Sequence, residues 1–413
     1  MIQLTDEQEK VIADAVHWFN YSTSQTFELS GSAGTGKSLV LQCIVSRLGL
    51  YKEQVAPCAY TGAAAIVMRR NNFINARTIH SLLYSYKEER DHKTKKVIKR
   101  TFEYVGVGRD VKLIIVDEAG MCDRNIRLDL EKTGAKIIVA GDVNQLPPIS
   151  GEPAYFQNPN NIHYLTKIMR QNEGSAIVML SRKVLNRERL YPGDYGEVLV
   201  ITKNEFNAHL EQYIRAYGIV LCGLNRTRDS INSLVRETIL RYDNPLPNVG
   251  ERLINRKNLW EKEVDNGIAL VNGTVGRCLT TVDVSKYNGY AFTIDFKPDF
   301  TDSAFSDLEV DYKYFLADYT TRRNMNNLFD PNDDRAKMEY AYACTTHVAQ
   351  GSQFDSGIYL QEYFPHNSNN LHYTGLTRFK QKALYVIPDF KKVYPTSTTT
   401  YKCEMLLPIA RVK

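Results

Sequence analysis

The 413-residue sequence is long enough for two or more domains, and its 43% hydrophobic and 24% charged residues are ordinary for a globular protein. No apolar run approaches the ~20 residues of a membrane span, and the first residues lack the basic flank and apolar core of a signal peptide. Seven cysteines without a C-x-x-C pair favour a reducing, cytoplasmic setting, and the net charge of +5 permits a nucleic-acid partner without arguing for one.

An amphipathic pattern over residues 4–20 predicts the first helix. Thr5 and Gln8 at its start fit a capping box, in which each side chain bonds the other's backbone amide. The amide of Gln8 could also read the edge of an adenine, since it precedes a phosphate-binding pattern by about 25 residues. The two roles need not exclude each other.

Residues 31–38 match the phosphate-binding pattern G-x-x-x-x-G-K-[ST] between an expected strand at 26–29 and an expected helix from 39 to 48. Its glycines let backbone amides point at phosphate oxygens, the lysine adds a positive charge, and the final hydroxyl can bind Mg²⁺. The residues assigned to nucleotide are Gly31, Ala33, Gly34, Thr35, Gly36, Lys37 and Ser38, with Ser38 also assigned to the metal.

A second strand is expected over 54–60, followed by the small-residue stretch 61–65 and by Ala-Arg-Thr-Ile-His-Ser at 76–81. Thr61, Thr78 and His80 lie where strands give way to helices. Hydroxyls at such junctions can bind a nucleic-acid phosphate, but they are also ordinary helix N-caps, and the cap is the commoner role.

The segment 84–109 interrupts the alternation of strands and helices and carries eight Lys or Arg against four acidic residues. Residues 97–107 alternate as a strand does, with Phe102 and Tyr104 on one face. The pattern predicts a small basic β-hairpin whose aromatics suit single-strand stacking or strand separation; the alternative is a solvated surface loop.

The apolar run 113–116 predicts a buried parallel strand, and Asp117 and Glu118 follow at its carboxyl end, where α/β sheets place their ligands. We expect Asp117 to hold Mg²⁺ and Glu118 to activate water. The strand at 136–140 leads to Gln145, a neutral side chain that could sense the γ-phosphate, and the first half closes at Arg170.

A second strand–helix series begins with residues 219–224 and a helix over 226–240. Asn-Gly pairs at 266–267, 272–273 and 288–289 each indicate a type I′ hairpin, which predicts a small antiparallel module over 250–338. The α/β pattern then returns with Thr345, His347 and Gly351, followed by Arg378 and a closing strand at 383–387. His347 has no partners at metal-ligand spacing.

Taken in order, these motifs resemble superfamily 1 helicases, and within them the RecD-like branch that includes Dda. The resemblance covers nearly the whole chain and rests on the phosphate loop, the Asp-Glu pair, the Gly-Asp-x-x-Gln stretch at 141–145, the T-x-H-x-x-Q-G stretch at 345–351 and the Thr-Gly-Leu-Thr-Arg stretch at 374–378. The Thr-Ile-His-Ser stretch at 78–81 and Asp-Arg at 123–124 favour the Dda and RecD-like branch.

The resemblance implies an α/β fold with two RecA-like parallel-sheet domains. The first would span 1–180 with the hairpin pin inserted at 84–109, and the second would comprise 181–249 and 339–413 around an SH3-like β module at 250–338. Domain closure would bring Arg170 and Arg378 to the γ-phosphate as arginine fingers. Gly351 would belong to the nucleotide site.

The implied activity is ATP- and Mg²⁺-dependent unwinding of DNA with 5′→3′ translocation on single-stranded DNA. Thr61, Thr78, His80, Thr345 and His347 would contact the strand, and Phe102 and Tyr104 would sit on the pin. The implied partners are single-stranded and forked DNA, with single-strand-binding or replisome proteins as further candidates, and the implied state is a monomer. A phage-encoded protein of this type would act in replication or recombination in the host cytoplasm.

Two alternatives remain open at this point. The same motifs fit an ATP-driven translocase that displaces proteins and unwinds poorly. A nucleotide-gated binding clamp without turnover is the other, although Glu118, Gln145 and Arg378 argue against it.

Overall fold

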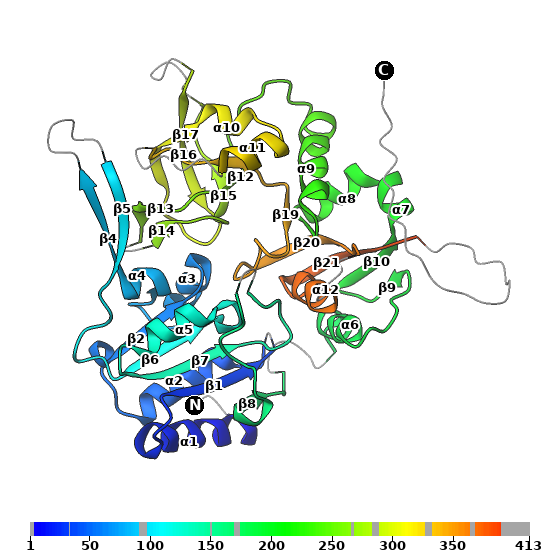
Figure 1. Ribbon diagram of the computed structural model, residues 1–413. Coiled ribbons are helices and arrows are strands. Elements are labelled where there is room, and N and C mark those ends of the chain that lie inside the picture. Colours follow the sequence, from blue (N-terminus) through cyan, green and yellow to red (C-terminus); the bar gives the residue numbers. More distant parts are fainter. Residues whose placement is uncertain are drawn as a thin grey trace.

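The computed structural model describes residues 4–32, 34–90, 97–148, 151–168, 174–265, 268–282, 289–326, 333–363 and 368–389. Two parallel sheets and one antiparallel sheet organise these residues (Figure 1).

The first parallel sheet has the strand order β3-β2-β6-β7-β1-β8, and each neighbouring pair is parallel. Its strands are β1 (Thr26–Gly31), β2 (Val55–Ala59), β3 (Arg77–Thr78), β6 (Leu113–Asp117), β7 (Lys136–Gly141) and β8 (Ile162–Leu165). The helices are α1 (Asp6–Tyr21), α2 (Lys37–Arg47), α3 (Gly62–Arg70), α4 (Ile79–Leu83) and α5 (Arg124–Glu131), and short 3₁₀ turns occupy Lys52–Gln54, Ala119–Met121 and Pro159–Asn161.

Alternation along the central strands explains why helices cover both faces of this sheet. Ile115 of β6 and Ile138 of β7 pack with α1, α2 and α3, whereas Ile114 and Ile137 pack with α4 and α5. The strands are therefore apolar on both faces, as expected for a doubly wound parallel sheet. The predicted α/β organisation of the first half is confirmed.

The second sheet has the order β19-β11-β20-β21-β10-β9, in which only the edge strand β9 is antiparallel to its neighbour. Its strands are β9 (Gly193–Asp194), β10 (Val198–Thr202), β11 (Val220–Cys222), β19 (Ala343–Thr345), β20 (Phe354–Leu360) and β21 (Phe379–Ile387). Helices α6 (Ala176–Leu185) and α12 (Ser368–Leu376) share one apolar cluster with it, and α7 (Lys203–Ala208), α8 (Leu210–Tyr217) and α9 (Asn225–Leu234) share the other. The helix expected over 226–240 ends at Leu234 and continues as a π-helical turn, Val235–Ile239, whose Arg236 donates to Glu251 at 3.1 Å.

A five-stranded antiparallel sheet of order β17-β16-β15-β12-β18 is inserted in the sequence of the second unit, between its strands β11 and β19. Its strands are β12 (Arg252–Asn255), β15 (Val275–Cys278), β16 (Ala291–Pro298), β17 (Phe305–Asp311) and β18 (Met338–Tyr340). Alongside it lie the strand pair β13 (Leu259–Val264) and β14 (Ile268–Leu270) and the helices α10 (Tyr312–Leu316) and α11 (Tyr319–Asn326). These elements are called the β module below.

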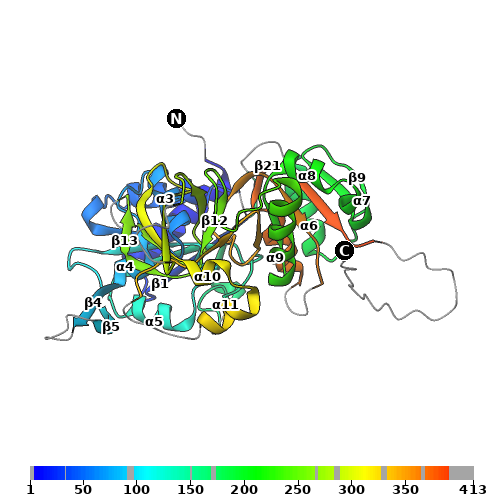
Figure 2. The ribbon, with the colours of Figure 1, turned by 90° about the horizontal axis from the view of Figure 1, so that it is seen from above.

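Strands β4 (Tyr84–Arg90) and β5 (Val97–Tyr104) pair in antiparallel fashion, with Tyr84 opposite Tyr104. Figures 1 and 2 both show this pair projecting from the first parallel-sheet unit beside β13 of the β module.

The prediction of a type I′ hairpin at Asn272–Gly273 is wrong. The strands on either side, β14 and β15, belong to different sheets. Gly273 has a φ of 90°, but Asn272 is not among the described residues with positive φ, and a type I′ turn needs both. The amide of Asn272 instead donates to the side chain of Asn258 at 2.7 Å, so the turn directs the chain from one sheet to the next. The other two Asn-Gly pairs lie wholly or partly outside the described residues.

The described part of the chain contains no helix with the length and apolar composition that a bilayer crossing requires.

Candidate functional site

The phosphate loop joins the end of β1 to the start of α2, and its conformation requires glycine at three positions. Gly34 and Gly36 have φ values of 84° and 86°, in the left-handed region that other residues rarely adopt. A Cβ atom at Gly31 would lie 2.5 Å from the hydroxyl of Thr35, so a side chain there would displace the loop. The loop opens on the N-terminus of an 11-residue helix, whose free amides and dipole favour an anion.

Lys37 reaches back over this loop. Its amine donates to the carbonyls of Gly31 at 2.5 Å and Ser32 at 3.2 Å, and Ser38 follows it in the first turn of α2. Ala33 lies outside the described residues. The donors, the left-handed glycines and the helix start therefore form a cradle whose chemistry fits a nucleotide phosphate.

Gln8 both caps the first helix and contacts the phosphate loop. Its side-chain carbonyl accepts from the backbone amide of Thr5 at 3.0 Å, and its backbone amide donates to the hydroxyl of Thr5, so the expected capping box is present. Its side-chain nitrogen also donates to the carbonyl of Thr35 at 3.2 Å. The cap and a position beside the phosphate loop thus coexist in one buried side chain.

Asp117 and Glu118 follow β6 at the carboxyl edge of the sheet. The carboxylate of Asp117 accepts from the amide of Glu118 at 2.9 Å. Burial, followed by repulsion from Glu118, raises the pKa of Asp117 to about 6, although nearby Lys37 acts to lower it. Glu118 adopts a left-handed conformation with φ 53°, which is uncommon for a residue with a side chain and is found disproportionately at functional sites.

The loop after β7, residues 142–146, carries Gln145 and contacts the second parallel-sheet unit. The amide of Leu146, next to Gln145, donates to the hydroxyl of Thr374 on α12 at 3.1 Å. Its carbonyl accepts from the side chain of Gln350 at 3.1 Å. A further bond of 2.9 Å runs from Asn370 to the carbonyl of Asn144. The loop is therefore held by residues of the other unit.

Arg378 follows α12 and is buried. Its guanidinium donates to the carbonyl of Thr374 at 3.2 Å and to that of Ser352 at 3.5 Å. Both acceptors belong to the second unit, so the fold positions Arg378 through backbone groups beside the loop that carries Gln145. Arg170, its expected counterpart, lies outside the described residues.

Thr61, Thr78, His80 and His347, all expected to bind nucleic acid, line one cavity of about 300 Å³. The hydroxyls of Thr61 and Thr78 accept from the amides of Ala64 and Ser81, so both are N-caps. Their capping role leaves them at the cavity wall.

Burial lowers the pKa of His80 and of His347, so both imidazoles are neutral at pH 7.

Thr345, also expected to bind nucleic acid, lies away from this cavity. It is buried in β19 opposite Cys222 and does not line the cavity.

Gly351 marks the place where the two parallel-sheet units meet. Its φ is 78°, and a Cβ atom there would lie 2.3 Å from the hydroxyl of Thr61. The three atoms nearest to that position all belong to Thr61. This contact puts Gly351 at the cavity, and its assignment to the nucleotide stays a prediction.

Sequence reasoning missed Trp260, which the β module contributes to the same cavity. Its ring lies 5.5 Å from that of His80 and 5.3 Å from that of Phe102, between centroids, with an edge-to-face arrangement toward Phe102. Tyr104 is anchored separately, since its hydroxyl donates to the carbonyl of Asp129 at 3.0 Å. The pattern that could have indicated it is a tryptophan in a strand that continues with exposed charged residues, Glu-Lys-Glu.

Comparison with known proteins matches residues 3–189 to the family described as AAA domain. Among curated proteins, the chain is 25% identical over 378 residues to the ATP-dependent RecD2 DNA helicase of Deinococcus radiodurans, covering 86% of this chain and 46% of that protein. It is 30% identical over 232 residues to the ATP-dependent DNA helicase RRM3 of Saccharomyces cerevisiae, covering 48% of this chain and 28% of that protein. The chain thus spans less than half the length of these relatives.

Solved structures share the fold at low identity. The Pif1 helicase of Bacteroides bound to single-stranded DNA matches with a TM-score of 0.53 at 18% identity, covering 94% of this chain and 95% of that one. The Pif1 helicase of Candida albicans matches with a TM-score of 0.51 at 17% identity, covering 95% of each chain.

The chain is thus similar in sequence to RecD2 and in fold to Pif1 helicases. The parallel sheets are accordingly a RecA-like core of the kind found in Pif1 structures. The relatives are named ATP-dependent DNA helicases, and the AAA domain fits an ATPase. The narrower Dda assignment stays a prediction.

Proposed function

We propose that this chain is an ATP-dependent DNA helicase that moves 5′→3′ along single-stranded DNA and unwinds duplex. The observation that carries the proposal is the cavity beside Thr61, His80, Trp260 and His347, which draws its wall from both RecA-like units and the β module. A strand bound there would contact all three, so a change in their relative position would move the strand.

The nucleotide site fits ATP with Mg²⁺. Lys37 and the amides at the start of α2 would hold the phosphates, with Gln8 beside the adenine, and Ser38 and Asp117 would hold the metal. Bound ATP supplies the phosphoryl group that is transferred to water. Glu118 would accept a proton from that water, since it adjoins Asp117 at the same sheet edge.

Residues of both units would make hydrolysis depend on domain closure. Arg378, and Arg170 by resemblance, would stabilise charge on the γ-phosphoryl group, and Gln145 would report its presence. The bonds from Leu146 to Thr374 and from Gln350 to Leu146 support this proposal, because they connect the Gln145 loop to the segment that positions Arg378 and to the cavity wall.

The β4–β5 strand pair would serve as the pin that separates the duplex. Phe102 at its edge is 47% exposed and contacts Trp260, which gives the pair a second support besides its own backbone hydrogen bonds. In this proposal residues 250–338 would form the SH3-like module, and the RecA-like domains would span 1–180 and, in two segments, 181–249 and 339–413.

Contacts to DNA would go mainly to its backbone, through Thr61, Thr78, His80 and His347, and would weaken as salt rises. Thr345, buried in β19, would support the neighbouring segment rather than contact the strand. We further propose a monomer of the Dda branch acting in the cytoplasm, with single-strand-binding or replisome proteins as partners.

The test is unwinding of partial duplexes with a single tail. A 5′-tailed duplex should be separated in an ATP- and Mg²⁺-dependent reaction, whereas a 3′-tailed duplex should stay largely intact. Unwinding from the 3′ tail alone would contradict the direction while leaving the motor intact. DNA-stimulated ATP hydrolysis with displacement of a bound protein, but with no strand separation from either tail, would favour a translocase, and ATP binding without turnover would favour a clamp.

A further inference from the structure

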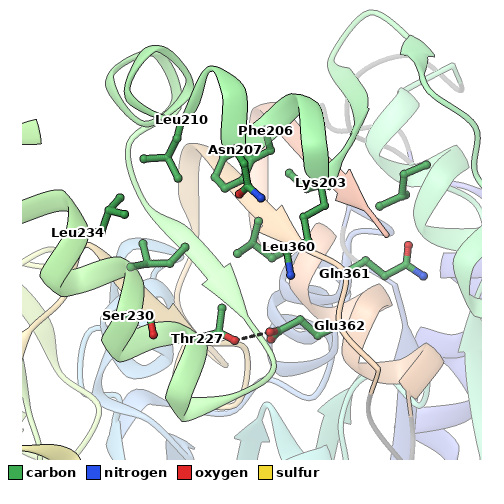
Figure 3. Close-up of a pocket in the computed structure, with 13 residues that line it drawn as sticks. Lys203, Phe206, Asn207, Leu210, Thr227, Ser230, Leu234, Leu360, Gln361 and Glu362 are labelled. Carbon is green, nitrogen blue, oxygen red and sulfur yellow. Dashed lines mark hydrogen bonds between the residues drawn. The ribbon is translucent and has the colours of Figure 1, made fainter. Parts of the chain in front are cut away.

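The second RecA-like unit contains an apolar cavity that the proposed motor does not use. It has a volume of about 140 Å³ and lies between α7 and α8 on one side, α9 on another and the ends of β20 and β21 (Figure 3). Phe206, Leu210, Ile231 and Leu234 come from the helices, and Leu360 and Ile387 from the strand ends. A cavity of roughly this size with such a lining accommodates an apolar group as large as benzene.

Glu362, the acidic side chain at the cavity wall, is already hydrogen-bonded within the second unit. Glu362 accepts from the amides of Gly223 at 2.7 Å and Leu224 at 3.0 Å, and from the hydroxyl of Thr227. It thereby satisfies amides just before α9. The cavity consequently offers its occupant apolar contacts rather than a free carboxylate.

The chain itself leaves the fold beside this cavity. Ile387, the last residue of β21, lines it, and the carboxylate of Asp389 accepts from the amide of Asn204 at 2.9 Å, which fixes the exit against α7. Residues 390–413 lie outside the described part of the chain. They contain a polar stretch, Pro-Thr-Ser-Thr-Thr-Thr at 395–400, and then the apolar run Met-Leu-Leu-Pro-Ile at 405–409.

We propose that residues 405–409 of this chain dock in the cavity between α7, α8 and α9, with a leucine side chain as the inserted group. The intervening residues 390–404 can span up to roughly 50 Å when extended, which exceeds what a return to the adjoining cavity needs. Such a short tether holds its end at about millimolar local concentration. Half-occupancy then needs a dissociation constant of about that size, which insertion of one leucine together with contacts of the other apolar residues of 405–409 at the rim of the cavity would supply.

The first test compares hydrogen exchange in the full chain with that in a chain ending at Asp389, without ATP or DNA. Segments 203–210 and 225–234 should exchange several-fold faster in the shortened chain, and α5 in the first unit should not change. Leu406→Asp with Leu407→Asp should reproduce the effect of shortening. The matched control, Thr398→Asp with Thr399→Asp, adds the same charge to the polar stretch and should behave as the parent. Equal exchange in all four proteins would overturn the proposal.

The second test supplies the segment from outside. A synthetic peptide of residues 400–413 should bind the shortened chain and restore protection. Leu234→Lys at the 38% exposed rim of the cavity should weaken this binding by about tenfold or more, whereas Leu128→Lys at a 45% exposed site on α5 should not. A peptide that fails to bind, or that binds both variants equally, would refute the assignment.

A thiol crosslink identifies which copy supplies the segment. Cys403 precedes the apolar run, so Asn207→Cys at the cavity should give a product within one chain that forms at all dilutions. A product that joins two chains and vanishes on dilution would show that a second copy fills the cavity, and would overturn docking by the chain's own segment. None of these outcomes depends on whether the chain is a helicase.

Discussion

Tyr373 on α12 donates a hydrogen bond of 2.7 Å from its phenol to the carboxylate of Asp142, across the junction between the two RecA-like units. Both side chains are buried. Burial, with the negative charge and hydrogen bond of Asp142, raises the pKa of Tyr373, so the phenol remains a donor at neutral pH. Since Asp142 begins the loop that carries Gln145, this bond couples that loop to the helix preceding Arg378.

Tyr373→Phe removes this donor and leaves the carboxylate of Asp142 one partner short. We expect the free energy of unfolding to fall by on the order of 1–3 kcal/mol. We also expect a lower kcat for ATP hydrolysis with little change in KM, since the loop and Arg378 would no longer be held together. Tyr385→Phe is the control, because this buried hydroxyl has no hydrogen-bond partner among the described residues and its loss should be neutral. Identical kcat values in the two variants would show that the bond is only structural.

Lys37→Ala and Glu118→Gln should separate binding from turnover. Lys37 lies over the phosphate loop, so its loss should weaken ATP binding. Glu118→Gln should bind ATP and DNA normally but hydrolyse ATP at least about 10²-fold more slowly, as expected for loss of a general base. Nucleotide affinity and single-turnover hydrolysis measure the two steps. Near-normal turnover in Glu118→Gln would remove this residue from the chemistry.

Arg378→Ala should abolish hydrolysis with a modest loss of ATP affinity, because a contact made mainly in the transition state affects rate more than binding. Arginine fingers contribute about 10³–10⁵ in rate in well-studied NTPases. Lys380→Ala, two residues further on at an exposed ion pair 3.9 Å from Asp355, is the control and should retain activity. A collapse of ATP affinity with unchanged rate at saturation would instead identify a ground-state contact.

Phe102→Ala should impair duplex unwinding while DNA-stimulated ATP hydrolysis stays near normal, since the pin is separate from the nucleotide site. Trp260→Ala should also impair unwinding, and because Trp260 lines the proposed strand cavity it should weaken the stimulation by DNA as well. Their rings touch, so the double variant should lose less than the sum of the singles, with a coupling of about 0.5–1.5 kcal/mol. Phe102→Ala with Tyr104→Ala tests the pin alone. Tyr21→Ala, at a 77% exposed aromatic on α1, is the control. Equal loss of unwinding and hydrolysis would reject a separate pin.

The raised pKa of Asp117 predicts that its ionised carboxylate lowers the free energy of unfolding of the nucleotide-free protein at neutral pH. Its pKa rises from 3.8 to about 6 on folding, so its contribution to stability is fully present below pH 3.8 and is lost as the pH rises through about 6. Asp117→Asn should therefore be more stable than the parent at pH 7, by on the order of 1 kcal/mol given its partial solvent access, and similar to it near pH 4. Denaturant unfolding of both proteins without nucleotide at pH 7 and near pH 4 measures their free energies of unfolding. The same difference between variant and parent at both pH values would contradict the prediction.

The same pKa also bears on activity. Protonated Asp117 cannot bind Mg²⁺, so ATP hydrolysis should fall as the pH drops through about 6. Raising the Mg²⁺ concentration should move this acid limb to lower pH, because the metal binds only the ionised form. A limb that does not respond to Mg²⁺ would point to another group.

The sequence by itself determined the features that depend on neighbours along the chain. The spacing from Gly31 to Ser38 predicts the phosphate loop, because amides and glycines within eight residues form it without outside help. Apolar runs such as 113–116 predict buried parallel strands for the same local reason. The capping box at Gln8 and the antiparallel pairing of residues 84–104 also follow from patterns within short segments.

Tertiary structure alone decided where distant segments meet. The Asn272–Gly273 dipeptide has the composition of a hairpin turn, but sheet membership is set by pairing between strands far apart in sequence. The hydrogen bond from the amide of Asn272 to the side chain of Asn258 holds the turn in another conformation. Trp260 reaches Phe102, and Tyr373 reaches Asp142, across about 160 and 230 intervening residues. Such contacts form only when separate hydrophobic cores pack together, and no local pattern encodes the relative position of those cores.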